Sequence, residues 1–190
     1  PNAVDAAIFG TASRSRPDGA PVRVLSVGRL AAEKGLDTLL RAVDGLPVEV
    51  VLAGSGPEEP RLRRMAGPNI TFLGTVARDA LPSLYADADV FVLPSRSEPW
   101  GMTLNEAALA GLPLVSTSAS GAAWELIEEG VNGFRVPPDD PAALRAALER
   151  LVADDELRRT AGTRSREIAA RFTPEGWAEA VVAAIEGAVR

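Results

Sequence analysis

The sequence predicts an α/β fold in which helices cover both faces of one parallel sheet of about six strands. Three observations on the 190-residue chain lead to this prediction. Short, nearly continuous apolar runs recur along it, as in strands that a parallel sheet buries on both faces. Segments with helical periodicity separate these runs, and from Pro141 onward the pattern is helical only. This alternation is typical of a Rossmann-like doubly wound sheet with right-handed crossovers, here followed by a helical C-terminal tail.

Each expected strand is rich in β-branched residues and is bounded by Gly or Pro, which favour turns. The strands are expected at Val22–Val27, Val48–Ala53, Ile70–Val76, Asp89–Leu93, Leu114–Thr117 and Gly133–Val136. The helices are expected at Glu33–Val43, Glu58–Ala66, Leu81–Ala86, Thr103–Ala110, Ala122–Glu128 and Pro141–Val152. Ligands of an open parallel sheet bind at the carboxyl ends of its strands, so the loops that follow the strands are where a site is expected.

The two ends of the chain differ from this pattern. Thr11–Pro21 is small, polar and turn-forming, which predicts a linker. Asp154–Phe172 is helical and rich in Arg, which predicts a solvated face, and Pro174 suits the first turn of a last helix. The apolar stripe expected on that last helix consists of Trp177, Val181, Val182 and Ile185.

The composition argues against several classes of protein. The net charge of −6 and the scattered Lys and Arg residues argue against a nucleic-acid partner. The absence of Cys excludes disulfides and thiolate metal sites and fits a cytoplasmic protein. The absence of His removes the commonest general base and the commonest metal ligand. No apolar stretch is long enough to span a membrane, so no transmembrane segment is expected.

The loop after the first expected strand carries the first candidate site, at Gly28, Arg29 and Lys34. Two cations in one short loop can converge on one anion, because Arg offers a planar fork of donors and Lys a point charge. A loop that merely exposes two cations explains this stretch equally well.

Two further loops are weaker candidates. Gly54-Ser55-Gly56 follows the second strand and is no dinucleotide fingerprint, but Gly54 would let a ligand approach the backbone closely. A tight turn at a strand end is the simpler explanation of this stretch. Ser116–Gly121 is a polar turn after the fifth strand, and ordinary helix capping explains it.

The strongest candidate lies in Ser97–Glu106, after the fourth strand. Glu98 lies in the loop and Glu106 on the helix that follows. The N–H groups of Gly101–Leu104 lie where that helix begins, and unpaired N–H groups at a helix start attract anions. A phosphate bound there would have a carboxylate on either side, and carboxylates accept hydrogen bonds from sugar or ribose hydroxyls. Alternatively, Glu98 only complements the helix dipole and Glu106 is an ordinary surface residue.

Taken together, four stretches resemble the C-terminal domain of the GT-B glycosyltransferases, specifically glycosyltransferase family 4. They are PNAVDAAIF, VGRLAAEKGLDTLL, SEPWGMTLNEAALAGLPLV and ASGAAWELIEEGVNGFRVPPDDPAAL. Their most specific element is the spaced pair Glu98 and Glu106. The resemblance covers nearly the whole chain and implies one half of a GT-B fold. It implies a single donor-binding domain over residues 1–190, with 1–21 as crossing segment and linker and 173–190 as C-terminal helix.

The resemblance implies a role for each site residue. Arg29 and Lys34 match the pair that binds the donor diphosphate, and Glu98 matches the residue that contacts the transferred sugar. These three are the expected catalytic residues, and Glu106 matches the residue that accepts hydrogen bonds from the ribose. The remaining matches are the backbone of Gly101, Met102, Thr103 and Leu104 near the phosphate and sugar and, more loosely, Val76 and Arg78 near the base.

The resemblance further implies retaining transfer of a sugar from a UDP- or GDP-activated donor, with no bound metal or other cofactor. A sugar, lipid or small-molecule acceptor would be held by an N-terminal domain that this chain lacks, so the chain alone would be inactive. The full-length protein would be cytoplasmic or peripheral at the membrane. Two departures concern the pocket: Trp100 stands where the family more often has Phe, and Ser118–Ala122 replaces the family's Gly-Gly turn.

Three alternatives stay open. A GT-B nucleotide-sugar epimerase would share the architecture and the donor chemistry, although the paired glutamates argue against it. An oxidoreductase with a dinucleotide-binding sheet lacks its Gly-rich fingerprint here. A decayed site is disfavoured by the intact set of Arg29, Lys34, Glu98 and Glu106.

Overall fold

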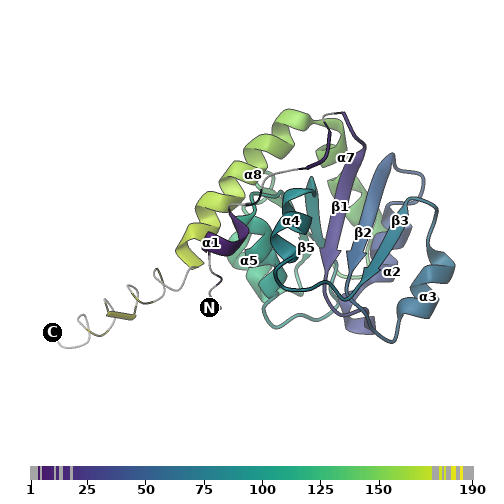
Figure 1. The fold of residues 1–190 in the computed structure, drawn as a ribbon, viewed down its shortest axis with the longest axis horizontal. Helices are drawn as coiled ribbons and strands as arrows, with labels where there is room; N and C mark the ends of the chain where they lie inside the picture. The colour runs from purple at the N-terminus through teal and green to yellow at the C-terminus, as the bar shows by residue number, and fades with distance from the viewer. Residues whose placement is uncertain are drawn as a thin grey trace.

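The structure, a computed structural model, describes residues 4, 6–10, 12, 15–17, 19–172, 176, 178, 181, 182 and 185. At its centre is a parallel sheet of six strands in the order β3-β2-β1-β4-β5-β6 (Figure 1). The strands are β1 (Val22–Val27), β2 (Val48–Ala53), β3 (Ile70–Gly74), β4 (Val90–Leu93), β5 (Leu114–Thr117) and β6 (Gly133–Val136). This strand order confirms the predicted Rossmann-like doubly wound sheet.

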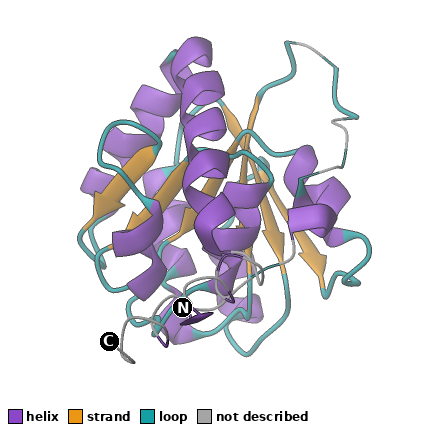
Figure 2. Cartoon of the chain, turned by 90° about the vertical axis from the view of Figure 1, so that its left-hand side faces the viewer, coloured by secondary structure: helices purple, strands orange, loops and turns teal. Residues whose placement is uncertain are grey.

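Helices lie on both sides of the sheet (Figure 2). They are α1 (Ala6–Phe9), α2 (Leu36–Ala42), α3 (Glu59–Met65), α4 (Leu81–Ala86), α5 (Met102–Leu109), α6 (Gly121–Leu126), α7 (Pro141–Ala153) and α8 (Asp155–Ala169), with short 3₁₀ turns η1 (Ala32–Lys34) and η2 (Ala170–Phe172). Side chains of α2, α3 and α7 pack on one face of the sheet, and those of α1, α4, α5, α6 and α8 pack on the other. The chain therefore has the three-layer architecture that the alternating pattern predicts.

Alternation along the strands divides the core in two. In β4, Phe91 and Leu93 join the cluster under α4 and α5, while Val90 and Val92 join the cluster under α2 and α7. All four side chains are almost completely buried. A strand buried on both faces needs apolar residues at every position, which is why these runs are continuous in the sequence.

The strand order places a switch point between β1 and β4. The chain proceeds outward from β1 to β3 and then returns to pair β4 with the other side of β1. The segment after β1 leads to α2 on one face, and the segment after β4 leads to α5 on the opposite face. The two loops therefore flank the crevice at the carboxyl edge where ligands of such folds bind.

Two of the predicted boundaries are wrong in an informative way. The helix expected over Glu33–Val43 is split into η1 and α2 by Gly35, which has a φ of 61°. The strand expected to reach Val76 ends at Gly74, whose carbonyl accepts a hydrogen bond from the N–H of Gly54 at 2.7 Å. In both places a loop contact at the carboxyl edge interrupts the regular element.

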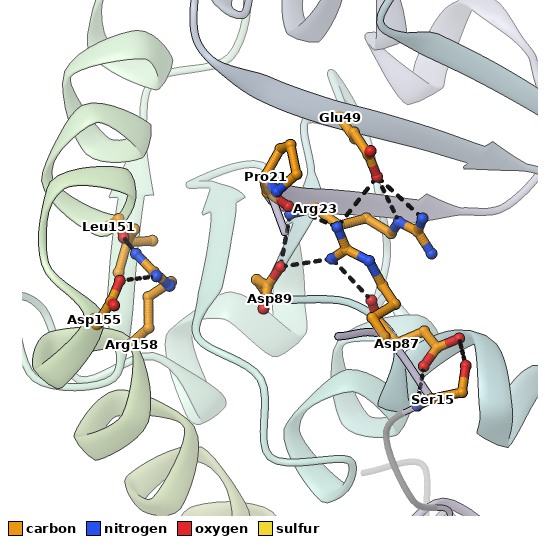
Figure 3. Close-up of polar contacts among 10 residues, drawn as sticks. Ser15, Pro21, Arg23, Glu49, Asp87, Asp89, Leu151, Asp155 and Arg158 are labelled. Carbon is orange, nitrogen blue, oxygen red and sulfur yellow. Dashed lines mark hydrogen bonds and ion pairs between the residues drawn. The ribbon is translucent and has the colours of Figure 1, made fainter. Parts of the chain in front are cut away.

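The ends of the chain are described in part. Within the predicted linker, the backbone N–H and the hydroxyl of Ser15 both donate to Asp87 at 2.7 Å (Figure 3). At the other end, two residues of the expected apolar stripe, Val182 and Ile185, are 54% and 59% exposed. Pro174 and Trp177 lie outside the described residues. Among the described residues, no helix has the length and apolar character required to cross a membrane.

Candidate functional site

The candidate site begins with an ion pair between Lys34 and Glu98. Lys34 ends η1 after β1, and Glu98 lies in the loop after β4. The Nζ atom of Lys34 contacts Oε2 of Glu98, and the two side chains are 22% and 13% exposed. Lys34 also lines a small pocket with Gly28, Arg29 and Leu93. The structure thus joins two predicted site residues from distant parts of the sequence at the switch point.

A network around Asp37 holds these two loops together. The backbone N–H of Arg96 donates to the carbonyl of Glu33 at 2.8 Å, and its guanidinium donates to that of Ala32 at 2.6 Å and to Asp37 at 2.8 Å. Burial raises the pKa of Asp37, but hydrogen bonds from Arg96 and Arg61 outweigh burial and hold that pKa below its usual value. The sequence-based interpretation did not include this network of contacts around Asp37.

Arg29 lies further from the centre of the site than Lys34 does. Its side chain is 67% exposed and forms an ion pair with Glu33, one turn along the chain. The carboxylate of Glu33 accepts hydrogen bonds from its own backbone N–H and from Arg29, and both lower the pKa of Glu33. Of the two cations predicted to converge on one anion, only Lys34 contacts Glu98. Arg29 has the exposure needed to reach a bound anion by changing rotamer.

The backbone around Glu98 is fixed by the turn after β5. The N–H of Glu98 donates to the carbonyl of Ala119 at 3.2 Å, and the N–H of Gly121 donates to the carbonyl of Glu98 at 3.2 Å. The hydroxyl of Ser120 donates to the carbonyl of Trp100 at 2.9 Å. The Ser116–Gly121 turn was expected to serve as an ordinary helix cap, but the side chain of Ser120 makes no capping hydrogen bond and the turn instead positions the loop that carries Glu98. The sequence gives no sign that this turn lies beside Glu98, because it is the pairing of β4 with β5 that brings the two loops together.

Gly101 allows the close approach that this loop requires. It has a φ of 104° and lies at the N-cap of α5. A Cβ atom there would lie 2.9 Å from both Leu93 Cδ2 and Ser120 Oγ, so another residue would have to displace these side chains and adopt a left-handed backbone. No side chain of the described residues caps α5. The first N–H groups of the helix therefore lack the carboxylate or hydroxyl partner that often occupies this position.

The four predicted residues at the start of α5 differ in what they can offer. Met102 is 36% exposed, and Thr103 is partly exposed. Leu104 is fully buried in the core, and its N–H already donates to the carbonyl of Gly101 at 2.8 Å. The predicted contact of Leu104 with the phosphate or sugar therefore involves only the backbone of the turn, whereas Met102 and Thr103 also have side chains at the surface.

Glu106 lies on α5, and its environment differs from that of Glu98 in the preceding loop. Its Oε2 atom accepts a hydrogen bond of 2.6 Å from the hydroxyl of Tyr85. Burial raises the pKa of Glu106, although Tyr85 and the positive charge of Arg78 act in the opposite direction. Glu106 is thus no ordinary surface residue. It is a partly buried acceptor with a defined partner.

Trp100, which stands where the family more often has Phe, makes contacts that a Phe could make only in part. Its Nε1–H donates to Oδ1 of Asn105 at 2.9 Å, and its ring lies 6.3 Å from that of Phe172 between centroids. A Phe at this position could not donate this hydrogen bond. The indole therefore fixes the loop against α5 and η2, while the Nδ2 atom of Asn105 is buried without a partner among the described residues.

The remaining predicted contacts lie on the neighbouring loops. A Cβ atom on Gly54, which has a φ of 137°, would overlap the carbonyl oxygen of Gly28. Glycine at position 54 is therefore explained by the contact between two loops, and its contact with a ligand stays a prediction. Val76 is partly exposed and Arg78 exposed in the segment between β3 and α4. Across the described part of the chain, no cluster of three or more acidic side chains could hold a metal ion.

Comparison with known proteins gives a consistent family match. The family model described as "Glycosyl transferases group 1" matches residues 12–168. The sulfoquinovosyl transferase SQD2 of Arabidopsis thaliana is 37% identical over 148 residues, which are 76% of this chain and 29% of that protein. The chain therefore spans less than a third of the length of this relative.

Solved structures with the same fold also extend beyond the chain. Sucrose-phosphate synthase from Thermosynechococcus elongatus has a TM-score of 0.84 and 28% identity, covering 100% of this chain and 52% of its own. The pneumococcal O-GlcNAc transferase GtfA, solved in complex with UDP and GlcNAc, has a TM-score of 0.79 and 26% identity, covering 99% and 39%. The six-stranded domain corresponds to about half or less of each of these chains.

Proposed function

Because the chain belongs to the glycosyl transferases group 1, with a GT-B-type domain, we propose that it binds a nucleoside-diphosphate sugar as the donor half of a retaining glycosyltransferase. The observation that carries this proposal is the contact of Lys34 with Glu98 beside the uncapped start of α5. A cation, a carboxylate and free helix N–H groups at one switch point match a ligand that joins a diphosphate to a hydroxyl-rich sugar.

The diphosphate would lie between Lys34, Arg29 and the start of α5. Lys34 is already held at the crevice by its contact with Glu98, while Arg29 is exposed beside it. Negative charge grows on the diphosphate as the bond to the sugar breaks. Fixed cations and helix N–H groups stabilise that charge most where it develops. In this proposal these groups stabilise the charge without a bound metal ion.

The reaction exchanges one bond at the anomeric carbon of the sugar. The bond from that carbon to the phosphate oxygen breaks, and a bond to an acceptor hydroxyl forms on the same face, so configuration is retained. The proton of the acceptor hydroxyl passes to the departing phosphate oxygen, and the nucleoside diphosphate leaves. This route needs no histidine from the chain, which has none. Glu98 would lie beside the sugar and stabilise positive charge that develops at the reacting carbon.

The nucleoside would extend from the diphosphate toward Glu106. This carboxylate accepts hydrogen bonds and would take the ribose hydroxyls. Val76 and Arg78, on the segment before α4, would lie near the base. The complex of GtfA with UDP and GlcNAc supports a nucleotide and a sugar as ligands of this fold.

The acceptor would be bound outside this chain. The relatives are longer, and the matching region is 29% of SQD2 and 52% of sucrose-phosphate synthase. We propose that an N-terminal domain holds a sugar, lipid or small-molecule acceptor across the cleft and that the chain alone transfers no sugar. Detectable transfer by the isolated chain would contradict this assignment of roles.

The test is a calorimetric titration of the chain with UDP, GDP and ADP, beside the double variant Arg29→Ala, Lys34→Ala. We expect one diphosphate to bind and its binding to disappear in the double variant. The matched control is Arg159→Ala, because Arg159 is 68% exposed and pairs with Glu156 within its own helix, much as Arg29 pairs with Glu33. Equal binding by the double variant and the control would overturn the proposed diphosphate site.

A further inference from the structure

A buried hydroxyl reaches the proposed ribose-binding carboxylate from the core. Tyr85, near the end of α4, is completely buried, and its hydroxyl donates to Oε2 of Glu106 at 2.6 Å. A buried Tyr hydroxyl needs an acceptor, and a neighbouring backbone carbonyl often serves. Here the acceptor is instead a side chain of the site on another helix. The proposed function gives Tyr85 no role.

The ring of Tyr85 is held on two sides by aromatic residues. It makes an edge-to-face contact with Phe9, with centroids 5.6 Å apart, and a tilted contact with Phe91 at 5.7 Å. Close packing of this kind allows a ring few alternative positions. The position of the hydroxyl, and hence of the Glu106 oxygen it holds, is therefore set by the core.

The protonation states give this hydrogen bond a direction. Burial raises the pKa of Tyr85 well above its usual value, so the hydroxyl stays a donor. Burial also raises the pKa of Glu106, while the hydrogen bond from Tyr85 and the charge of Arg78 lower it. On the far end of α5, Arg166 of α8 donates to the carbonyls of Leu109 and Ala110. The hydrogen bond from Tyr85 therefore favours the ionised form of Glu106, whereas burial favours its protonated form.

We infer that Tyr85 is a positioning residue that holds Glu106 as an ionised acceptor, with Oε1 left for the hydroxyls of the ribose. The inference rests on the proposed function, which places the nucleoside at Glu106. No other side chain among the described residues makes a direct hydrogen bond to this carboxylate. Tyr85 occupies one oxygen, so the other remains to accept from the ligand.

The test is the variant Tyr85→Phe, which removes only the hydroxyl and keeps the ring contacts with Phe9 and Phe91. UDP, GDP and ADP are titrated into the wild-type chain and the variant across a range of pH. The diphosphate that binds the wild-type chain should bind the variant about tenfold more weakly near neutral pH. This is the effect of losing one hydrogen bond to a charged group. The difference should widen as the pH falls, because Glu106 is protonated at a higher pH in the variant than in the wild type.

The pH dependence separates positioning from a merely structural role. Without the hydroxyl, the pKa of Glu106 rises further, so affinity is lost at a higher pH than in the wild type as the pH falls. The titration of the ligand's own phosphate cancels in the ratio of the two affinities. Adding Glu106→Gln removes the titrating group, and in that background Tyr85→Phe should leave the pH profile unchanged.

Ser165→Ala is the matched control. Ser165 is fully buried and accepts a hydrogen bond from Asn132 at 3.1 Å, away from the site. Its loss should alter stability without moving the pH profile of binding. Absence of binding of all three diphosphates to the wild-type chain would overturn the proposed donor site itself. Binding with the same affinity and pH profile in Tyr85→Phe would overturn the inference alone.

Discussion

The two edges of the sheet use charged residues in opposite ways. At the amino edge, Arg16 is 7% exposed and donates to Asp89 at 2.9 Å and to Glu49 at 3.2 Å, while the backbone N–H of Arg23 also donates to Asp89 (Figure 3). At the carboxyl edge, Arg29 is 67% exposed. Charges that the protein pairs with several partners brace the fold, and charges with few partners stay available to a ligand.

Position alone does not decide which role a charge takes. Asp37 lies at the carboxyl edge, yet it is buried and accepts from Arg96 at 2.8 Å and from Arg61 at 3.1 Å. It therefore resembles the amino-edge cluster in its degree of pairing. The comparison predicts that removing a charge with several partners in the protein lowers the free energy of unfolding. Removing a charge with few partners should instead weaken ligand binding.

The largest effect is expected at the amino edge. Asp89→Ala should lower the free energy of unfolding by about 3 kcal/mol, because the buried guanidinium of Arg16 loses a charged partner and the N–H of Arg23 loses its acceptor. Nucleoside-diphosphate affinity should stay unchanged. Chemical denaturation of the variant checks the first expectation, and calorimetric titration checks the second.

Asp155→Ala is the exposed counterpart of this substitution. Asp155 pairs with Arg158, as the second group of residues in Figure 3 shows, but its side chain is 92% exposed. Solvent already satisfies such a carboxylate, so its removal should leave the denaturation curve almost unchanged. Equal losses in Asp89→Ala and Asp155→Ala would break the link between buried pairing and stability.

The next effect concerns binding. Lys34→Ala should weaken the binding of the nucleoside diphosphate by about 2 kcal/mol, or roughly thirtyfold, because Lys34 lies at the crevice in contact with Glu98. Arg29→Ala should cost only about threefold, since an exposed side chain loses more conformational freedom on binding. Titration of the two single variants gives the ranking, and a larger loss in Arg29→Ala would reverse this view of the site.

A smaller effect on stability is expected at Asp37. Hydrogen bonds from its arginines outweigh burial and place its pKa below the unfolded value near 3.8. Its contribution to stability is therefore present above that value and lost as the pH falls through the lower folded pKa. Asp37→Asn should lower the unfolding free energy by about 1.5 kcal/mol at pH 7 and by less in acid. Denaturation at several pH values measures this, and a pH-independent loss would exclude the ion pairs as its cause.

The fold was largely predictable because both-face burial leaves a local signature. Four of the six strands, including β1 and β5, have the bounds that their apolar runs predict. The split at Gly35 was not predictable from periodicity, because its cause is a contact with the loop after β4. Local patterns report which face of an element is buried, but they do not report which loops meet.

The candidate site was predictable only as a set of residues. The spacing of Glu98 and Glu106 gave no indication that one pairs with Lys34 and the other with a buried Tyr85. Nor did it indicate that Arg29 and Lys34, five residues apart in the same short stretch, would differ threefold in exposure, at 67% and 22%. These differences arise from contacts between segments that lie far apart in the chain, and such contacts leave no periodic trace in the sequence.

The smallest effect concerns the least paired carboxylate of the site. Burial raises the folded pKa of Glu106 above the unfolded value near 4.5, despite Tyr85 and Arg78. The stability associated with its protonated form is complete below that value and is lost as the pH rises through the folded pKa. Glu106→Gln should therefore raise the unfolding free energy by about 1 kcal/mol at pH 7 relative to the wild type and have little effect near pH 4.

The same substitution should weaken nucleoside-diphosphate binding, because an amide is a poorer acceptor for hydroxyls than a carboxylate. Glu149→Gln, at an exposed ion pair with Arg145, is the control and should change neither stability nor binding. A variant that is more stable but binds the nucleoside diphosphate less well would show that the Glu106 carboxylate lowers the stability of the fold and strengthens ligand binding. A destabilised Glu106→Gln variant would instead place Glu106 with Asp89 and Asp37, among the charges that brace the fold.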